Sequence, residues 1–255
     1  MLMVTPKKRL GQHFLTDLNI AKKIADSLNS RKNVIEVGPG TGVLTEYFIR
    51  ESDINFKAIE TDDEAYNFLL KKYSEFADKF ILDDFLKFDI SLLFNDNYSI
   101  VGNFPYNISS QIFFKVIDNK EQVTEVVGMI QKEVAERIAS KEGNKTYGIL
   151  SVLLQAYYNI EYLFTVNENV FNPPPKVKSA VIRLTRNNVK KLDCDEKLFK
   201  QIIKISFNQR RKMLRGSLKQ FTNNIVVADY NIFTKRPEQL SVSEFIYLTN
   251  LLSNY

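Results

Sequence analysis

A short stretch in the middle of the chain, Gly102-Asn103-Phe104-Pro105-Tyr106, carries residue types that could activate a conjugated amine. The exocyclic amine of a nucleobase is a poor nucleophile because its lone pair is delocalised into the ring. The Asn103 side-chain carbonyl and a backbone carbonyl at Phe104 or Pro105 could localise that lone pair by accepting both N–H bonds. Pro105 would stiffen the backbone, and Tyr106 offers a flat face to a base that has left its stack. In isolation, the same residues could form a simple bend after a strand.

A second stretch places three glycines, Gly38, Gly40 and Gly42, directly after an apolar run. Glycines there let the backbone turn tightly and approach a ligand. Their spacing differs from the dinucleotide pattern G-x-G-x-x-G, and no G-K-[ST] follows, which excludes a Walker phosphate loop.

Glu60 ends the next apolar run, where a carboxylate can accept hydrogen bonds from both ribose hydroxyls. Asp84 follows the third run and could face an adenine edge. Each acid alone could be a helix cap, but together with the glycines they predict an adenosine site.

Short β-rich runs alternate with amphipathic segments up to about residue 186. Five of the runs are nearly continuous in apolar residues, which is typical of strands buried on both faces of a parallel sheet. A helix is expected after the second run, with Thr61 and Glu64 as a capping box. We therefore predict an open α/β sheet with right-handed crossovers. Its parallel strands are expected at 34–38, 56–60, 79–83, 99–103 and 125–130, and an antiparallel pair at 157–164 and 178–185 closes it.

The β pattern stops near residues 187–191, and the remainder indicates helices. A capping-box pattern at Ser241 and Glu244 opens the last of them. We predict two domains, 1–186 and a small helical domain at 187–255.

A basic run lies inside the second domain. Residues 204–219 carry six basic side chains and no acidic one. A run of this kind can be an ordinary solvated face, but phosphate contact explains its lack of acidic neighbours better. The side chains expected to contact phosphate are Arg210, Arg211, Lys212 and Arg215.

Composition limits the classes to which the chain can belong. Its 255 residues are 44% hydrophobic and 25% charged, with a net charge of +5. This mild excess suits a polyanionic partner without requiring one. No apolar run approaches the roughly 18 residues of a membrane span, and the first residues lack the apolar segment of a secretion signal. A lone cysteine, Cys194, sits between two aspartates, so we expect an inert thiol, no internal disulfide and a cytoplasmic protein.

Eight stretches that occur in order along essentially the whole chain resemble the motifs of one family. This family is the small-subunit (16S) ribosomal RNA adenine N6,N6-dimethyltransferases. They are GQHFL, VIEVGPGTGVLTE, AIETD, GNFPYNIS, QKEVAERI, YGILSV, FNPPPKVKSAVIRL and FNQRRKMLRGSL. The resemblance implies a Rossmann-like class I methyltransferase sheet with a small C-terminal helical domain that contacts RNA. It also implies S-adenosylmethionine as cofactor and dimethylation of two adjacent adenines in the 3′-terminal hairpin of 16S rRNA, within an immature small ribosomal subunit.

The resemblance also implies roles for individual residues. On the family pattern, Phe171 forms a second aromatic wall for the target adenine, beside Asn103, Pro105 and Tyr106. The residues that border the cofactor are His13, Leu15, Gly38, Glu60, Asp84 and Asn103. Two positions depart from the commonest pattern: Phe104 stands where Leu is more frequent, so the pocket's detailed shape is expected to differ, and His13 stands where Asn is also common. We interpret His13 as a packing and hydrogen-bonding residue rather than a base.

No Cys/His cluster is present, so no metal is expected. Separately, the chain is expected to act as a monomer.

Three alternative functions remain at this point. A 23S rRNA adenine methyltransferase would share both sites, although FNPPPKV and FNQRRKMLRGSL resemble the small-subunit enzymes better. A non-catalytic nucleic-acid-binding factor on the same scaffold is disfavoured by the intact Asn-x-Pro-Tyr. A nicotinamide-dependent dehydrogenase is disfavoured by the glycine spacing.

Overall fold

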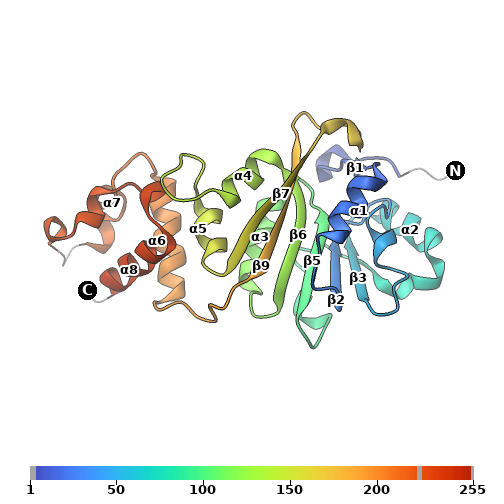
Figure 1. Ribbon diagram of the computed structural model, residues 1–255, viewed down its shortest axis with the longest axis horizontal. Coiled ribbons are helices and arrows are strands. Elements are labelled where there is room, and N and C mark those ends of the chain that lie inside the picture. The colour runs from blue at the N-terminus through green and yellow to red at the C-terminus, as the bar shows by residue number, and fades with distance from the viewer. Residues whose placement is uncertain (1–3, 223–225, 254–255) are drawn as a thin grey trace. The chain divides into compact units, whose positions relative to one another are not determined.

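The computed structural model describes residues 4–222 and 226–253 (Figure 1). Their contacts divide the chain into two compact units. One comprises Met1–Ala135 with Asn159–Arg186, and the other comprises Glu136–Tyr158 with Asn187–Tyr255. The second unit therefore resumes at residue 187, where the helical domain was expected to begin. It also takes in residues 136–158, which sequence reasoning had placed in the first domain.

A seven-stranded sheet forms the centre of the first unit, in the order β4-β3-β2-β5-β6-β9-β7. The first five strands in this order are parallel, and β9 runs antiparallel to β6. Their bounds are β2 (Asn33–Val37), β3 (Asn55–Glu60), β4 (Phe80–Leu82), β5 (Tyr98–Asn103), β6 (Val123–Gln131), β7 (Tyr158–Val166) and β9 (Ser179–Arg186). The predicted runs overlap these strands. The inner strands are visible in the sequence because a strand covered on both faces must be apolar at nearly every position. All five residues of β2 are buried.

The chain order reverses between β2 and β5, since β2 pairs with β3 on one side and with β5 on the other. Open α/β sheets hold their ligands in the crevice that forms at the carboxyl ends of the strands at such a reversal. The glycine stretch follows β2, and the Asn-Phe-Pro-Tyr stretch follows β5. The topology therefore brings these two motifs to one edge of the sheet.

Three longer helices belong to the first unit: α1 (Leu18–Asp26), α2 (Asp63–Lys72) and α3 (Ser109–Asp118). Asp62 caps α2, and its side chain accepts a hydrogen bond from the Glu64 backbone N–H at 3.1 Å. The predicted capping box at Thr61 is therefore wrong by one residue. The physical reason is that aspartate is the better N-cap residue, and its carboxylate accepts one of the free N–H groups of the first helical turn.

Two short strands, β1 (Phe14–Leu15) and β8 (Phe171–Asn172), pair antiparallel outside the main sheet. Phe14 lies opposite Asn172 and Leu15 opposite Phe171. The sequence did not predict this pair, because two residues carry no periodicity. It joins the N-terminal GQHFL stretch to the proline-rich FNPPPK turn.

The second unit contains α5 (Ile149–Gln155), α6 (Glu196–Asn208), α7 (Leu214–Ser217) and α8 (Val242–Ser253), and α4 (Lys132–Ala139) spans the boundary. Phe207 packs against Tyr147 and Phe245, with ring centroids 6.2 and 6.0 Å apart. The predicted capping box of the last helix is confirmed: Ser241 N–H donates to Glu244, and Glu244 N–H donates to Ser241 Oγ.

Short 3-10 turns complete the chain: η1 (Lys8–Leu10), η2 (Thr45–Tyr47), η3 (Ser74–Lys79), η4 (Ile90–Leu92), η5 (Glu168–Val170), η6 (Lys219–Phe221), η7 (Val227–Asp229), η8 (Asn231–Thr234) and η9 (Pro237–Gln239). Among the described residues, no helix has the length and apolar character needed to cross a membrane.

Candidate active site at the carboxyl edge of the sheet

A cavity opens at the carboxyl ends of β2, β3, β4 and β5, within the first unit. It encloses about 920 Å³ of empty space, part of it open to solvent. Predicted and unpredicted residues line it together: Leu10, Gly11, Gln12, His13, Phe14, Gly38, Gly40, Glu60, Thr61, Asp83, Asp84, Asn103, Pro105, Tyr106 and Asn107 among others.

The glycine stretch forms one wall of the cavity. Gly38 and Gly40 have φ angles of 67° and 57°, in the left-handed region that favours glycine. A Cβ on Gly40 would lie 2.9 Å from the Phe14 ring, so no larger residue fits there without a shift. A Cβ on Gly38 would lie 3.8 Å from the ring of Pro105, which shows how closely the two motifs approach each other.

The Glu60 carboxylate, only 4% exposed, is held by three backbone N–H groups. Gly40 N donates to one oxygen at 3.0 Å, and the amides of Thr61 and Asp62 donate to the other at 2.9 Å. Burial raises the pKa of Glu60, and these three hydrogen bonds oppose the rise. A carboxylate has about four lone-pair sites, so a site remains on the oxygen bonded to Gly40. Glu60 is therefore a fixed acceptor at the cavity wall, of the kind that a ribose hydroxyl needs.

Asp84 lies on the cavity wall beyond the end of β4. Its side chain is 38% exposed, and one of its oxygens accepts a hydrogen bond from the Leu86 backbone at 3.0 Å. The other oxygen is 3.8 Å from Lys87 Nζ. Such a loosely held carboxylate keeps acceptor capacity for an amine donor at the edge of a bound base.

Asn103, at the end of β5, has its side-chain amide oriented by the chain itself. Its Nδ2 donates to the backbone carbonyl of His13 at 2.8 Å. Because an amide carries its donor and its acceptor on opposite sides, this bond turns Oδ1 away from His13. Among the described residues, no group donates to Oδ1. Asn103 therefore lines the cavity with its acceptor oxygen uncommitted.

The backbone after Asn103 supplies a second acceptor. The Pro105 carbonyl already accepts a hydrogen bond from Ile108 N–H at 3.1 Å. No group in the described part of the chain donates to the Phe104 carbonyl. The backbone N–H of Phe104 donates to the Met129 carbonyl at 3.0 Å. Of the two carbonyls that the sequence left open, the one on Phe104 is thus the one with no donor among the described residues.

Phe104 itself, the departure from the commoner Leu, is fully buried. A Cβ on Gly128 would come within 2.5 Å of its ring, and one on Gly102 within 2.9 Å. The ring also makes an edge contact with Phe113, with centroids 5.9 Å apart. Two glycines on neighbouring strands therefore make room for the larger side chain within the core.

Tyr106 and His13 form an aromatic pair on the cavity wall. Their ring centroids are 5.3 Å apart and the planes are tilted by 30°. The Tyr106 hydroxyl hydrogen-bonds with Ser179 Oγ at 2.5 Å, and burial raises its pKa despite this bond. His13 Nδ1 lies 2.7 Å from the Pro173 carbonyl, so Nδ1 carries the proton because a carbonyl can only accept. These bonds fix both rings and favour the packing interpretation of His13.

Two predicted site residues lie elsewhere. Leu15 and Phe171 are 5% and 4% exposed, belong to the hydrophobic core, and are not among the residues that line the cavity. The cause is the register of β1 and β8, which pairs these two residues and directs both side chains inward. The ring that lies beside Tyr106 on the cavity wall is that of His13.

Sequence reasoning missed Gln12, Phe14 and Asn107 on the cavity wall. Gln12 and Phe14 lie in the GQHFL stretch and Asn107 in GNFPYNIS, so the motifs themselves contained the signal. Of the described residues, no group of three His, Cys, Asp or Glu side chains is placed to hold a metal ion.

The basic run, residues 204–219, lies in the second unit, where it begins in the last turns of α6 and continues through α7 to the start of η6. Arg210 donates to the Lys145 backbone carbonyl at 2.7 Å, and Lys212 Nζ donates to Gln209 at 2.9 Å. Arg211, Lys212 and Arg215 are exposed. Within the described ranges none of these four basic side chains forms an ion pair. No acidic side chain of the described residues thus competes with a partner's negative charge for Arg210, Arg211, Lys212 or Arg215.

Comparison with known proteins identifies the family. The family described as ribosomal RNA adenine dimethylase matches residues 3–250. A protein of Bacteroides fragilis named ribosomal RNA small subunit methyltransferase A is 56% identical over 254 residues, covering 98% of this chain and 93% of its own. A protein of the same name from Cytophaga hutchinsonii is also 56% identical, and 99% of each chain is covered.

Two solved structures share the fold. A dimethyladenosine transferase from Plasmodium falciparum has a TM-score of 0.79 at 24% identity, over 95% of this chain and 98% of its own. The 23S rRNA methyltransferase ErmE has a TM-score of 0.69 at 22% identity, over 93% of this chain and 99% of its own. The predicted fold class, a class I methyltransferase sheet, and the predicted cofactor, S-adenosylmethionine, are confirmed. This chain belongs to the ribosomal RNA adenine dimethylase family of S-adenosylmethionine-dependent methyltransferases.

Proposed function

We propose that this chain dimethylates N6 of two adjacent adenines in the 3′-terminal hairpin of 16S rRNA, within an immature small ribosomal subunit in the cytoplasm. The observation that carries the proposal is the oriented Asn103 amide, whose Nδ2 is bonded to the His13 carbonyl and whose Oδ1 is left for a substrate. The relatives at 56% identity, named for the ribosomal small subunit, support the choice of RNA.

The cofactor end of the cavity fits an adenosine moiety. Gly38 and Gly40 allow close approach of the backbone, Glu60 offers a fixed acceptor for a ribose hydroxyl, and Asp84 offers one for the adenine amine. When bound, S-adenosylmethionine supplies a methyl group on a positively charged sulfur, which makes the methyl electrophilic.

The acceptor end fits the amine of a target adenine. In the first transfer, Asn103 Oδ1 and the Phe104 carbonyl each accept a hydrogen bond from one N–H of N6 and so localise its lone pair for attack on the methyl group. In the second transfer one N–H remains, and one of the two acceptors binds it. Tyr106 stacks on the base, a contact worth roughly 1–3 kcal/mol. Because the product ammonium loses its proton readily to water, the residues need not include a strong base.

RNA binding is assigned to the basic run of the second unit. Arg210, Arg211, Lys212 and Arg215 lack ion-pair partners within the described residues, and phosphate groups are their natural partners. The chain is proposed to act as a monomer.

A large-subunit rRNA adenine methyltransferase is the alternative, because the ErmE structure shares the fold. The two are separated by offering under-methylated small subunits and large subunits in parallel, with labelled S-adenosylmethionine, and mapping the modified nucleotide. We expect label in N6,N6-dimethyladenosine at two adjacent adenines of the small-subunit hairpin. Label confined to the large-subunit RNA would contradict the proposal.

A further inference from the structure

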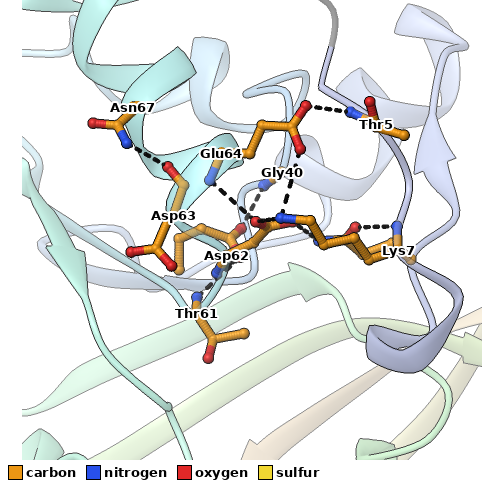
Figure 2. A network of polar contacts seen from close by, with 10 residues as sticks. Thr5, Lys7, Gly40, Thr61, Asp62, Asp63, Glu64 and Asn67 are labelled. Carbon is orange, nitrogen blue, oxygen red and sulfur yellow. Dashed lines mark hydrogen bonds and ion pairs between the residues drawn. The ribbon is translucent and has the colours of Figure 1, made fainter.

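A network of polar contacts ties the N-terminal segment to the loop between β3 and α2 (Figure 2). The Lys7 ammonium forms an ion pair with Asp62 and lies 3.5 Å from Glu64. Gln12 Nε2 donates to the second Asp62 oxygen at 2.9 Å. The Thr5 backbone N–H donates to Glu64 at 2.9 Å. Five residues from two distant parts of the chain thus bond to one another beside the cavity.

Asp62 is the centre of this network. Its side chain is 1% exposed, whereas that of Lys7 is 29% exposed. Burial alone would raise the pKa of Asp62, but the hydrogen bonds from Lys7, Gln12 and the Glu64 backbone outweigh it and lower the pKa. The Asp62 carboxylate is therefore ionised and fully engaged by the protein. Neither Asp62 nor Lys7 lines the cavity, so neither has a direct role toward a ligand there.

The network reaches the cofactor end of the site through the backbone of Asp62. The Asp62 N–H donates to Glu60 at 2.9 Å, and Glu60 is the acceptor that faces the cavity. The position of the loop that carries Asp62 therefore helps to fix the Glu60 carboxylate.

The network reaches the acceptor end through Gln12. The Gln12 side chain is held at both ends: its oxygen accepts from Lys7 N–H at 2.8 Å, and its nitrogen donates to Asp62. The next residue, His13, supplies the carbonyl that orients the Asn103 amide. Gln12 thus fixes the backbone on which the orientation of Asn103 depends.

We propose that Lys7, Gln12 and Asp62 act as positioning residues, forming a latch that holds residues 10–14 against the cavity and aligns its two ends. With the latch closed, Glu60 and Asn103 are both set for their ligands. With the latch broken, residues 10–14 leave the cavity wall more often and a bound cofactor escapes faster. The inference rests on the cofactor site assigned above.

The test compares Lys7→Met with Lys8→Met. Both variants remove one positive charge, but Lys8 is exposed and forms no ion pair within the described residues. We measure hydrogen exchange of residues 10–14 without ligand, and the affinity and dissociation rate of S-adenosylhomocysteine. Lys7→Met should raise exchange in this segment and weaken affinity about fivefold or more, mainly through faster dissociation. Lys8→Met should match the wild type in all three measurements.

A second variant, Asp62→Asn, keeps a good helix cap while removing the charge. It should reproduce the effect of Lys7→Met, and the double variant should add little to either. Equal exchange and equal affinity for Lys7→Met and Lys8→Met would overturn the latch, as would full additivity in the double variant. Failure of the wild-type protein to bind S-adenosylhomocysteine would instead overturn the cofactor site itself, so the two failures can be told apart.

Discussion

The charged groups at the cavity of the first unit differ from those of the basic run in what surrounds them. Glu60 is 4% exposed and accepts hydrogen bonds from three backbone N–H groups. Arg211, Lys212 and Arg215 face solvent, and in the described part of the chain no acid pairs with them. A buried, bonded charge has one geometry and can define where a small ligand sits. An exposed cationic side chain can adopt many geometries, and it suits a partner whose negative charge extends over several phosphates.

This difference separates the conditions to which each region responds. Exposed charges are screened by salt over about 10 Å at 0.1 M ionic strength, whereas buried ones are screened much less. Cofactor binding should therefore depend on local geometry and pH, and subunit binding on ionic strength. Each variant below changes one region and leaves the other as its control.

Glu60→Ala should give the largest effect on cofactor binding. Losing a hydrogen bond to a charged acceptor costs about 1.5–3 kcal/mol, which corresponds to roughly 10- to 100-fold in the Kd of S-adenosylhomocysteine. The matched control is Asp63→Ala, which removes an exposed acid three positions away. Calorimetry of both folded variants measures the effect, and an unchanged Kd for Glu60→Ala would remove this residue from the site.

Tyr106 should act through its ring more than through its hydroxyl. Tyr106→Ala loses the stacking contact, which should raise the free-energy barrier to methylation by roughly 1–3 kcal/mol. Tyr106→Phe loses only the bond to Ser179, about 0.5–1.5 kcal/mol. Ser179→Ala removes the same bond from the other side and should match the phenylalanine variant in single-turnover rate. A phenylalanine variant as slow as the alanine one would assign the hydroxyl a further role.

Replacing Arg211, Lys212 and Arg215 together with Gln should weaken subunit binding and flatten its salt dependence. Each lost phosphate contact lowers the slope of log K against log salt concentration by about 1. Affinity for S-adenosylhomocysteine should stay unchanged. Lys71→Gln, at an exposed position of the first unit, is the control for charge alone. A wild-type salt slope in the triple variant would make the basic run an ordinary solvated face.

Glu36, buried on β2, should make the free energy of unfolding depend on pH. Burial raises its pKa from 4.5 to about 8, against the hydrogen bond from Thr45. Because the folded state holds this proton more tightly, the free energy of unfolding falls as pH rises from about 4.5 to about 8. Glu36→Gln removes the titration, so its stability relative to wild type should rise by roughly 3 kcal/mol from pH 5 to pH 8. Urea unfolding at both pH values measures this, and a pH-independent difference would refute it.

Sequence reasoning located the parts of the site that follow directly from strands. The strands buried on both faces are visible as apolar runs, and Gly38, Glu60, Asp84 and Asn103 lie where those runs end. The topology of the sheet then brings them to one cavity. The inert thiol of Cys194 was also predicted, from its acidic neighbours; in the structure burial is the larger cause, and it raises the pKa to about 11.

Features decided by contacts between distant residues were not predictable from local patterns. Leu15 and Phe171 are buried because β1 and β8 pair across more than half of the chain. The grouping of residues 136–158 with the second unit likewise depends on tertiary packing.

The central claim is that Asn103 activates the adenine amine, and single-turnover methylation of under-methylated small subunits by Asn103→Ala tests it most directly. Because the amide acts chiefly as charge develops on N6, its removal should cost rate rather than binding. By analogy with the loss of one fixed oxyanion-hole donor, the rate should fall roughly 10²–10³-fold, while affinities for S-adenosylhomocysteine and for subunits stay within a few-fold of wild type. Methylation by Asn103→Ala at the wild-type rate would contradict the account.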